Sequence, residues 1–378
     1  MKKVVIFTSR GGGGHLSVSN ALEQQLKGEY DVRQVFIFSD VLGTIDPINL
    51  ISRGRYNGEI LYNWFMRKRI YWVLNAMASL GSVIYSLFAP RVELKLNAFF
   101  QAEQPDLVIS AIPLVNSSIL AVTKQRNLPF IVIPTDLDAT TFINGFKGDN
   151  YKNLYFTLPF DNELIKQSIE AANIPSHNVC VTGFVLRPDF FELKDIARIK
   201  KDLNVPEGKP VIMLMMGAVG SDVAYHFTQE LSKMKQPAHL LVCTGRNEKL
   251  RKKIATLPLP DHISMTLIGF TQKIAELMAV SDLFITKSGT VSFCEGMYMN
   301  IPMLLDATST VLEWEKLNHQ LAKDHDFGTS VKSHEQVRHV VESLIADPQR
   351  LAAMRANLES MHKKRGCQEI KKLIKEIL

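Results

Sequence analysis

Short apolar runs, separated by amphipathic stretches and turns, recur along the whole chain. In the first half these runs predict strands at 2–8, 32–38, 107–111, 130–133, 154–157 and 178–182. A helix follows the first strand, because Val18, Leu22 and Leu26 fall on one helical face. Strands that alternate with helices predict a parallel, doubly wound sheet.

The second half repeats this pattern after a turn-rich step at 205–210. Its apolar runs predict strands at 211–216, 239–243, 263–268, 282–286 and 302–305, and helices from about 334 onward. We therefore predict an α/β protein of two Rossmann-like doubly wound domains facing a cleft. The expected domains are 1–187, with a helical insertion at about 46–104, and 205–350, and we expect helices at 351–378 to pack back on the first domain.

The segment 70–90 contains no charged residue, yet its pattern differs from that of a membrane span. One helical stripe collects the apolar residues Trp72, Val73, Ala76, Met77, Leu80, Val83, Ile84, Leu87 and Phe88. The other face carries Asn75, Ser79, Ser82 and Ser86. A lipid-spanning helix would be apolar all round, so the pattern predicts an amphipathic helix. We expect it to pack on the core in preference to lying on a membrane.

Composition narrows the classes of protein. Of 378 residues, 46% are hydrophobic and 22% charged, a balance typical of a globular protein and not of a disordered one. The net charge of +6 favours anionic partners. The four cysteines lack paired spacing, which argues against structural zinc and disulfides and fits a cytoplasmic protein. The four-residue apolar run after Met1-Lys2-Lys3 is too short for a signal peptide.

A glycine-rich turn between the first strand and the first helix is the strongest chemical signal. Gly11–Gly14 are followed directly by His15. Consecutive glycines let the backbone approach a bound group and expose amides at a helix N-terminus. An imidazole at this point can act as a general base. The alternative is a flexible turn with an incidental histidine.

A second candidate site follows the strand predicted at 282–286. Ser288-Gly289-Thr290 opens a helix, where free amides suit a diphosphate. Glu295 in that helix can accept hydrogen bonds from ribose hydroxyls, and Gly217 and Gly220 can border the phosphates. The alternatives are a solvated helix residue for Glu295 and an ordinary strand–helix turn for the glycines.

The glycine-rich turn, Gly-Gly-Gly-Gly-His-x-Ser, resembles that of the plant and bacterial monogalactosyldiacylglycerol synthases. Shorter forms occur in the processive diacylglycerol glucosyltransferases and the peptidoglycan glucosaminyltransferase. All belong to glycosyltransferase family 28, whose fold is GT-B. Further segments resemble the family's motifs, in order along most of the chain: 134–137, 183–190, 216–220, 243–247, 268–270, 281–295 and 315–318.

The resemblance implies an inverting transfer of a hexose from a UDP-sugar to a lipid hydroxyl, with diacylglycerol as the expected acceptor. His15 is expected to take the acceptor proton, and Asp136 to orient the acceptor or His15. Gly11, Gly12, Gly13, Gly14 and Ser17 are expected on the acceptor side. The expected UDP-binding residues are Gly217, Gly220, Gly245, Arg246, Asn247, Phe270, Ser288, Gly289, Thr290 and Glu295. The expected donor-sugar residues are Lys287, Glu315 and Asn318.

We expect neither a cofactor nor a metal beyond the UDP-sugar substrate. Asp136 and Asp138 have the spacing of an Asp-x-Asp motif, but they do not sit convincingly at the end of a strand. In a GT-B setting, amides and a helix dipole are expected to stabilise the leaving group.

The basic, aromatic segment 52–71 is the candidate membrane contact. Five basic residues and one acidic residue give it a net charge of +4. The expected contact residues are Trp64, Phe65, Arg67, Lys68 and Arg69, because aromatic and cationic side chains suit an anionic bilayer surface. This predicts a cytoplasmic protein peripherally bound to the membrane. The alternative is a helix packed on its own domain with a solvated basic end. A nucleic-acid partner is not expected, since no RNA-binding fold is apparent.

Three other functions remain open. One is transfer of N-acetylglucosamine from its UDP derivative to a polyprenyl-diphosphate lipid, and another is a UDP-sugar 2-epimerase. The third is a non-catalytic protein that binds anionic lipid or nucleotide. Ala218 and Trp314 depart from the family pattern, and these departures would fit that alternative. The sequence leaves the donor open among UDP-galactose, UDP-glucose and UDP-N-acetylglucosamine.

Overall fold

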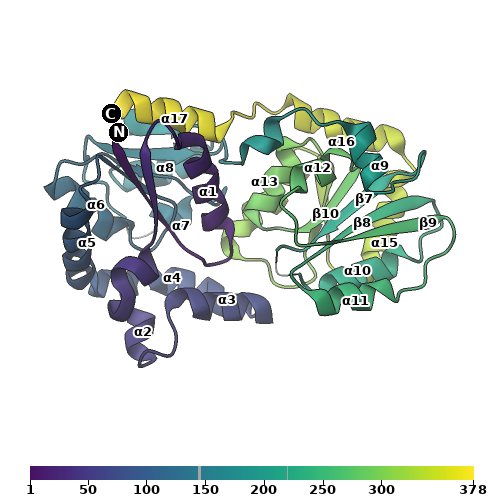
Figure 1. Ribbon diagram of the computed structural model, residues 1–378, viewed down its shortest axis with the longest axis horizontal. Helices are drawn as coiled ribbons and strands as arrows, with labels where there is room; N and C mark the ends of the chain where they lie inside the picture. Colours follow the sequence, from purple (N-terminus) through teal and green to yellow (C-terminus); the bar gives the residue numbers. More distant parts are fainter. Residues whose placement is uncertain (144–145, 219) are drawn as a thin grey trace. The chain divides into compact units, whose positions relative to one another are not determined.

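The computed structural model describes residues 1–143, 146–218 and 220–378, apart from the side chains of residues 51, 67, 78, 79 and 82. Val219 of the 216–220 motif and the Arg67 side chain therefore lie outside the described part. The chain divides into two compact units (Figure 1). Unit 1 comprises Met1–Pro188, Leu312–Trp314 and Lys363–Leu378, and unit 2 comprises Asp189–Val311 and Glu315–His362.

A parallel sheet forms the centre of unit 1. Within the described ranges its six strands are β1 (Lys3–Thr8), β2 (Asp31–Phe36), β3 (Leu107–Ser110), β4 (Phe130–Val132), β5 (Leu154–Leu158) and β6 (Val179–Val181). Their order is β2-β1-β3-β4-β5-β6, with every neighbouring pair parallel. The central strands β1, β3 and β4 are buried on both faces, which explains their continuous Val, Ile and Phe runs.

Unit 1 also contains α-helices. They are α1 (Gly14–Leu26), α2 (Pro47–Ile51), α3 (Gly58–Lys68), α4 (Tyr71–Leu87), α5 (Ala89–Glu103), α6 (Asn116–Gln125), α7 (Thr140–Ile143), α8 (Glu163–Ala171) and α17 (Gly366–Ile377). The ring of Phe7 on β1 packs against Phe99 and Phe100 of α5. The long connection between β2 and β3 is thus helical, as the sequence pattern predicts, and one of its helices belongs to the core.

The surface of α4 differs from the sequence-based expectation. Trp72, Ala76, Leu80, Val83 and Leu87, which are spaced three or four residues apart, are exposed. Among the described side chains of this helix, Leu74 and Tyr85 are buried, and the Tyr85 ring packs against Phe38. The expectation that the whole apolar stripe packs on the core is therefore wrong. No helix in the described part of the chain combines the length and apolar character that a membrane crossing needs.

Unit 2 repeats the architecture around a second parallel sheet. Within the described residues its six strands are β7 (Val211–Met215), β8 (Ala238–Gly245), β9 (Ile263–Gly269), β10 (Leu283–Lys287), β11 (Met303–Asp306) and β12 (Gly328–Val331). Their order is β12-β11-β10-β7-β8-β9. Strand β12, Gly-Thr-Ser-Val, was not expected, because this short edge strand has only two buried residues and no apolar run.

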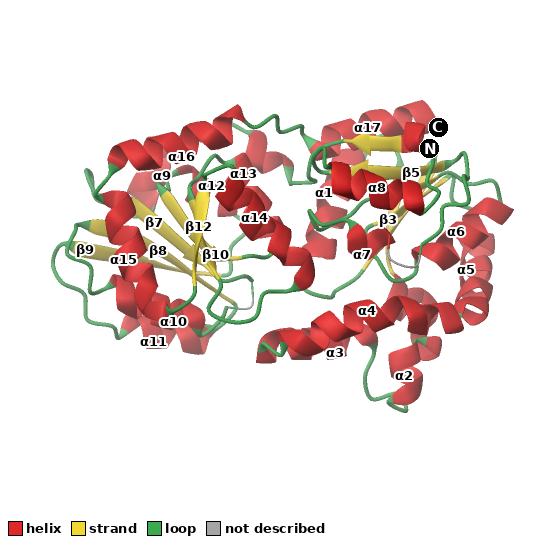
Figure 2. Ribbon diagram, turned by 180° about the vertical axis from the view of Figure 1, so that it is seen from behind, coloured by secondary structure: helices red, strands yellow, loops and turns green. Residues whose placement is uncertain are grey.

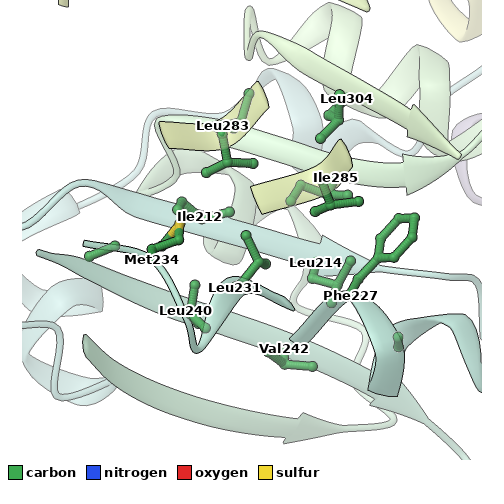
Figure 3. Close-up of a cluster of buried hydrophobic side chains, with 14 of the residues drawn as sticks. Ile212, Leu214, Phe227, Leu231, Met234, Leu240, Val242, Leu283, Ile285 and Leu304 are labelled. Atoms are coloured by element: carbon green, nitrogen blue, oxygen red, sulfur yellow. The ribbon is translucent and has the colours of Figure 1, made fainter. Parts of the chain in front are cut away.

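The core of unit 2 lies between the sheet and its helices. The helices are α9 (Ile196–Asp202), α10 (Val223–Leu231), α11 (Glu248–Ala255), α12 (Ile274–Ala279), α13 (Thr290–Tyr298), α14 (Lys316–Asp324), α15 (His334–Ile345) and α16 (Pro348–Ser360). Figure 3 shows Leu214 and Val242 of the strands close to Phe227 and Leu231 of α10, all fully buried. This packing holds the strand ends that carry the second candidate site.

The C-terminal helices divide between the units. Helix α16 belongs to unit 2, whereas α17 belongs to unit 1 and packs on α1 (Figure 2). The chain entering α17 crosses the segment after β6 at very short range, and the Cys367 Sγ lies 3.2 Å from the Leu186 carbonyl oxygen. A Cβ at Gly183 would overlap the Lys364 carbonyl, and one at Gly366 would overlap the Phe184 carbonyl. Glycine at both positions therefore allows α17 to dock.

This crossing predicts a stability effect. Gly366→Ala should lower the free energy of unfolding of unit 1 by about 1–3 kcal/mol, because the added methyl meets backbone that cannot rotate away. Gly269→Ala is the control, since the nearest atom to its Cβ would lie 3.9 Å away. Urea denaturation followed by circular dichroism measures both variants. Equal effects of the two substitutions would contradict the packing argument.

Candidate active site

Each sheet has one point where the strand order reverses, and a predicted motif lies at each. In unit 1 the chain passes from β1 outward to β2 and then returns to β3 on the other side of β1. In unit 2 it passes from β7 to β8 and β9 and then returns to β10 beside β7. Such reversals leave a crevice at the carboxyl ends of the strands, where α/β proteins bind ligands. The glycine loop follows β1, and Ser288–Thr290 follow β10.

The glycine loop of unit 1 makes a tight turn into α1. Gly12 and Gly13 have φ of 68° and 87°, in the left-handed region that glycine adopts without strain. The Ser9 Oγ accepts a hydrogen bond from the Gly11 N–H, and the Gly13 N–H donates to the Gly11 carbonyl. Helix α1 begins at Gly14, so His15 lies in its first turn, where the first amide groups lack intrahelical acceptors, and the Ser17 N–H makes the first helical bond by donating to the Gly13 carbonyl.

His15 is held in one tautomer. Its Nδ1 lies 2.7 Å from the carbonyl oxygen of Ala111, directly after β3, and 2.9 Å from the Thr135 Oγ1, after β4. A carbonyl can only accept, so Nδ1 carries the proton and donates it to Ala111. The Nε2 is therefore the nitrogen with the free lone pair, which is the atom that a general base needs.

Burial keeps this imidazole neutral. Loss of hydration lowers the pKa of His15 from 6.5 to about 4, against a smaller opposing effect of the Ala111 hydrogen bond. The neutral form of the imidazole therefore predominates at pH 7.

The two partners of His15 were missed in the sequence. Thr135 directly precedes the predicted residue Asp136 and is buried, whereas Asp136 is partly buried. The Thr-Asp segment was thus a signal for Thr135 as well. Ala111 acts through its backbone, so no side-chain pattern marks it. The role of Asp136 remains a prediction, and Asp138 accepts hydrogen bonds from the Thr140 backbone and hydroxyl.

Around β7 and β10 of unit 2, the structure brings together residues that are far apart in sequence. The Lys287 side chain lies against Gly289 and Gly217, because Cβ atoms there would sit 2.9 Å and 3.5 Å from its Cε. Gly289 precedes α13, whose first residue is Thr290. A lysine and a helix N-terminus beside two glycine turns form a cationic site suited to a diphosphate.

Glu315 and Asn318 are tied to this same turn. The Ser288 hydroxyl donates to the Glu315 carboxylate at 2.9 Å. The Asn318 amide donates to the Ser288 carbonyl at 2.6 Å and to the Thr290 hydroxyl at 3.2 Å. The Asn318 Oδ1 is buried with no hydrogen-bond partner in the described part of the protein. Glu295 is also buried, so its interpretation as a solvated helix residue is wrong, and its predicted role toward ribose is unaffected.

Two of the predicted UDP-binding glycines have a structural reason of their own. A Cβ on Gly220 would overlap the Thr244 carbonyl, and one on Gly245 would overlap the Ala218 carbonyl. Both glycines have positive φ, and the Arg246 N–H donates to the Ala218 carbonyl. The loops after β7 and β8 are thus interlocked by their backbones. The substitution to Ala218 does not disturb this contact, which uses only main-chain atoms.

The remaining predicted nucleotide residues lie at the ends of β8 and β9. The Arg246 guanidinium stacks 3.8 Å from the centre of the Phe270 ring, which is 50% exposed. Such an exposed stacked pair offers a flat surface to a base. The Asn247 side chain caps α11 by accepting from the Leu250 N–H. No cluster of metal-ligating side chains occurs among the described residues.

The predicted membrane residues lie on α3 and at its end. Trp64 and Lys68 are exposed, whereas Phe65 and Arg69 are partly buried. The Phe65 ring packs edge-on against Trp64. Helix α3 packs beside α4 (Figures 1 and 2), whose apolar residues are also exposed.

Both halves of the chain match known family models. Residues 15–186 match the monogalactosyldiacylglycerol (MGDG) synthase model, and residues 211–377 match the glycosyltransferase family 28 C-terminal domain. The processive diacylglycerol beta-glucosyltransferase of Bacillus subtilis (strain 168) is 26% identical over 96% of this chain and 91% of its own length. The chloroplastic monogalactosyldiacylglycerol synthase of Spinacia oleracea is 28% identical over 81% of this chain and 59% of its own.

Solved structures agree on the fold. MurG of Acinetobacter baumannii aligns over the whole of both chains with a TM-score of 0.66 and 12% identity. The spinosyn rhamnosyltransferase SpnG aligns over 99% of this chain and 100% of its own with a TM-score of 0.61 and 11% identity. With an MGDG synthase domain followed by a family 28 C-terminal domain, the chain belongs to glycosyltransferase family 28 and is a glycosyltransferase of GT-B fold.

Proposed function

We propose that this glycosyltransferase moves a hexose from a UDP-sugar to the hydroxyl of diacylglycerol, with inversion, at a membrane surface. The observation that carries the proposal is His15, whose Nδ1–H is bound to the Ala111 carbonyl and whose Nε2 is left as a neutral base. The activities of the relatives, which are processive diacylglycerol glucosyltransferases and a monogalactosyldiacylglycerol synthase, support the lipid acceptor.

The chemistry is a single displacement. His15 Nε2 takes the proton of the acceptor hydroxyl as its oxygen attacks the anomeric carbon of the hexose. The bond from that carbon to the diphosphate oxygen breaks, and UDP leaves with the electron pair. Attack opposite to the leaving group inverts the anomeric centre.

Unit 2 supplies the groups that suit the leaving diphosphate. Negative charge grows on the diphosphate as the bond breaks, and Lys287 and the N-terminus of α13 can stabilise it. The Glu315 carboxylate and the buried Asn318 Oδ1, which has no hydrogen-bond partner among the described residues, are suitable acceptors for sugar hydroxyls. These groups need neither a metal nor a cofactor, and we propose none.

The exposed apolar residues of α3 and α4 support binding to a bilayer. Trp64 is 47% exposed, and Trp72, Leu80, Val83 and Leu87 are between 55% and 76% exposed. Basic side chains of the same region, among them Lys68, favour anionic lipid. We therefore propose a cytoplasmic enzyme that is bound peripherally to the membrane and takes its acceptor from it.

A transfer assay tests the function and the base together. The full chain, with vesicles of diacylglycerol and anionic lipid, should form a glycolipid from UDP-glucose or UDP-galactose. His15→Ala should lower kcat by about 10²- to 10⁴-fold and leave UDP affinity unchanged. In the wild type, kcat/KM should be level from pH 6.5 to 8 and fall on acidification toward 4, as Nε2 gains a proton.

Other outcomes of this assay contradict the proposal. A product only from UDP-N-acetylglucosamine and a polyprenyl-diphosphate acceptor would assign the other transferase activity. Epimerised UDP-sugar without transfer would assign the epimerase, and UDP binding without turnover would indicate a non-catalytic protein. Full activity of His15→Ala would remove the base assignment alone.

The donor site is tested by a charge placed at the α13 N-terminus. Gly289→Glu should weaken UDP binding at least about tenfold, because a carboxylate beside Lys287 repels the diphosphate. Ala255→Glu is the control, because Ala255 is exposed on α11 and accepts a longer side chain without backbone strain. Titration calorimetry with UDP measures both variants. Equal affinities would exclude this turn as the phosphate site.

Vesicle binding is tested by two equally exposed leucines of unit 1. Leu87 on α4 is 76% exposed and Leu164 on α8 is 74% exposed. Leu87→Ala should weaken sedimentation with anionic vesicles by about fivefold, since partial burial of a leucine is worth about 1 kcal/mol. Leu164→Ala should leave it unchanged. A loss of similar size in both variants would contradict the assignment of the surface to α3 and α4.

A further inference from the structure

Helix α3 holds the backbone of the glycine loop through two side chains that the sequence analysis did not assign. The Glu59 Oε1 accepts a hydrogen bond from the Arg10 N–H at 2.8 Å. One turn later, the Asn63 Oδ1 accepts from the Gly12 N–H and its Nδ2 donates to the Arg10 carbonyl, both at 3.0 Å. The backbone of residues 10–12 thus forms three hydrogen bonds with side chains of α3.

The loop needs such support from outside. Glycines lose more conformational entropy on ordering than other residues, and two of the four have positive φ. Gly13, which caps α1, provides no side-chain hydrogen bond to the helix. Within the loop, the Ser9 hydroxyl and the Gly11 carbonyl each accept one amide. The side chains of α3 therefore supply much of the order that the glycines cannot.

Packing against α3 also distinguishes among the glycines. A Cβ on Gly11 would lie 3.6 Å from the Tyr62 ring, and one on Gly12 would lie 3.3 Å from it. A Cβ on Gly13 would have no atom within 4 Å. Close approach of α3 thus favours a small residue at 12, the Ser9 hydroxyl at 3.2 Å does so at 11, and the space beside Gly13 is open.

Burial of the Glu59 side chain costs free energy, which hydrogen bonds to its carboxylate must offset. Its side chain is buried, in a part of the structure that also contains the buried Asp46 and Tyr85. A buried carboxylate is disfavoured unless hydrogen bonds compensate its lost hydration. The Arg10 amide provides one of these bonds. Asn63, by contrast, is partly exposed and forms its two loop bonds without burying a charge.

We propose that Asn63, assisted by Glu59, is a positioning residue that sets the glycine loop, and with it the start of α1, for the reaction of His15. The inference rests on the proposed function, because the loop serves the acceptor side of that reaction. Neither side chain touches the reacting atoms. Their effect is on the path of residues 10–12, four residues or fewer before the N-terminal turn that carries His15.

The test compares Asn63→Ala with Asn63→Asp and with a distant control. Asn63→Ala removes both loop bonds, whereas Asn63→Asp keeps an acceptor for the Gly12 amide. Asn97→Ala is the control, because Asn97 is also partly exposed and bonds to a neighbouring segment through its side chain, here Arg126. Two readouts are measured on the full chain, namely hydrogen–deuterium exchange of residues 9–14 and transfer kinetics.

Asn63→Ala should speed exchange in the 9–14 segment by about fivefold to tenfold. The reason is that the Gly12 amide loses its acceptor, and the net stability contributed by a hydrogen bond is of this size. It should lower kcat on diacylglycerol vesicles by about 10- to 100-fold and leave UDP affinity unchanged. Asn63→Asp should recover part of both effects, and Asn97→Ala should behave as the wild type. Unaltered exchange in Asn63→Ala overturns the proposal, as does faster exchange with an unaltered kcat.

The exchange readout separates this inference from the proposed function. It needs no substrate, so it reports on the loop even if the wild type transfers no hexose. Faster exchange in Asn63→Ala with an inactive wild type would remove the proposed function and with it the positioning role in catalysis. An active wild type together with unaltered exchange and kcat in Asn63→Ala would leave the function standing and remove Asn63.

Discussion

The hydrogen bond from His15 Nδ1 to the Ala111 carbonyl connects the two strands between which the order of the first sheet reverses. It ties the first turn of α1 to the end of β3, and the Thr135 hydroxyl after β4 approaches the same nitrogen. Because a carbonyl accepts only, this one contact fixes the tautomer and leaves Nε2 as the base. The glycine loop turns the chain from β1 into α1 and thereby allows His15 to reach the Ala111 carbonyl.

Unit 2 also has a six-stranded parallel sheet within the described residues, with a different strand order, and it gathers another kind of group. Its strand reversal between β7 and β10 brings together a lysine, a helix N-terminus and two glycine turns, which together favour negative charge. Glu315 and Asn318 stabilise that turn from α14 and the segment before it. Gly220 and Gly245 allow two loops to pack closely against each other. Gly289, in contrast, leaves space for the Lys287 side chain.

The helical insertion of unit 1 has two kinds of surface. Side chains of α3 hold the glycine loop, and α5 packs its phenylalanines against β1. The outer residues of α3 and α4, including Trp64 and Leu87, remain exposed and apolar. Such a surface is unfavourable in water, which is the physical reason to propose that a bilayer covers it.

The sequence by itself determined the two sheets, the strand–glycine–helix turn and the family, because short apolar runs, 3.6-residue periodicity and short motifs are local properties. It also indicated His15, which follows the glycine loop after β1, and Ser288–Thr290, which directly follow β10. It missed β12, whose short edge strand lacks an apolar run, and it placed the α4 stripe on the core, because periodicity gives a face but not the environment of that face.

Only the tertiary structure decided which groups meet at the sites. Ala111 acts through its backbone, and Asn63 and Glu59 lie about 50 residues from the loop that they hold, so no spacing rule relates them. The same holds for Gly220 and Gly245, whose need for glycine comes from carbonyls of another loop. Contacts of this kind arise from how strands are ordered in a sheet, and that order is a property of the folded chain.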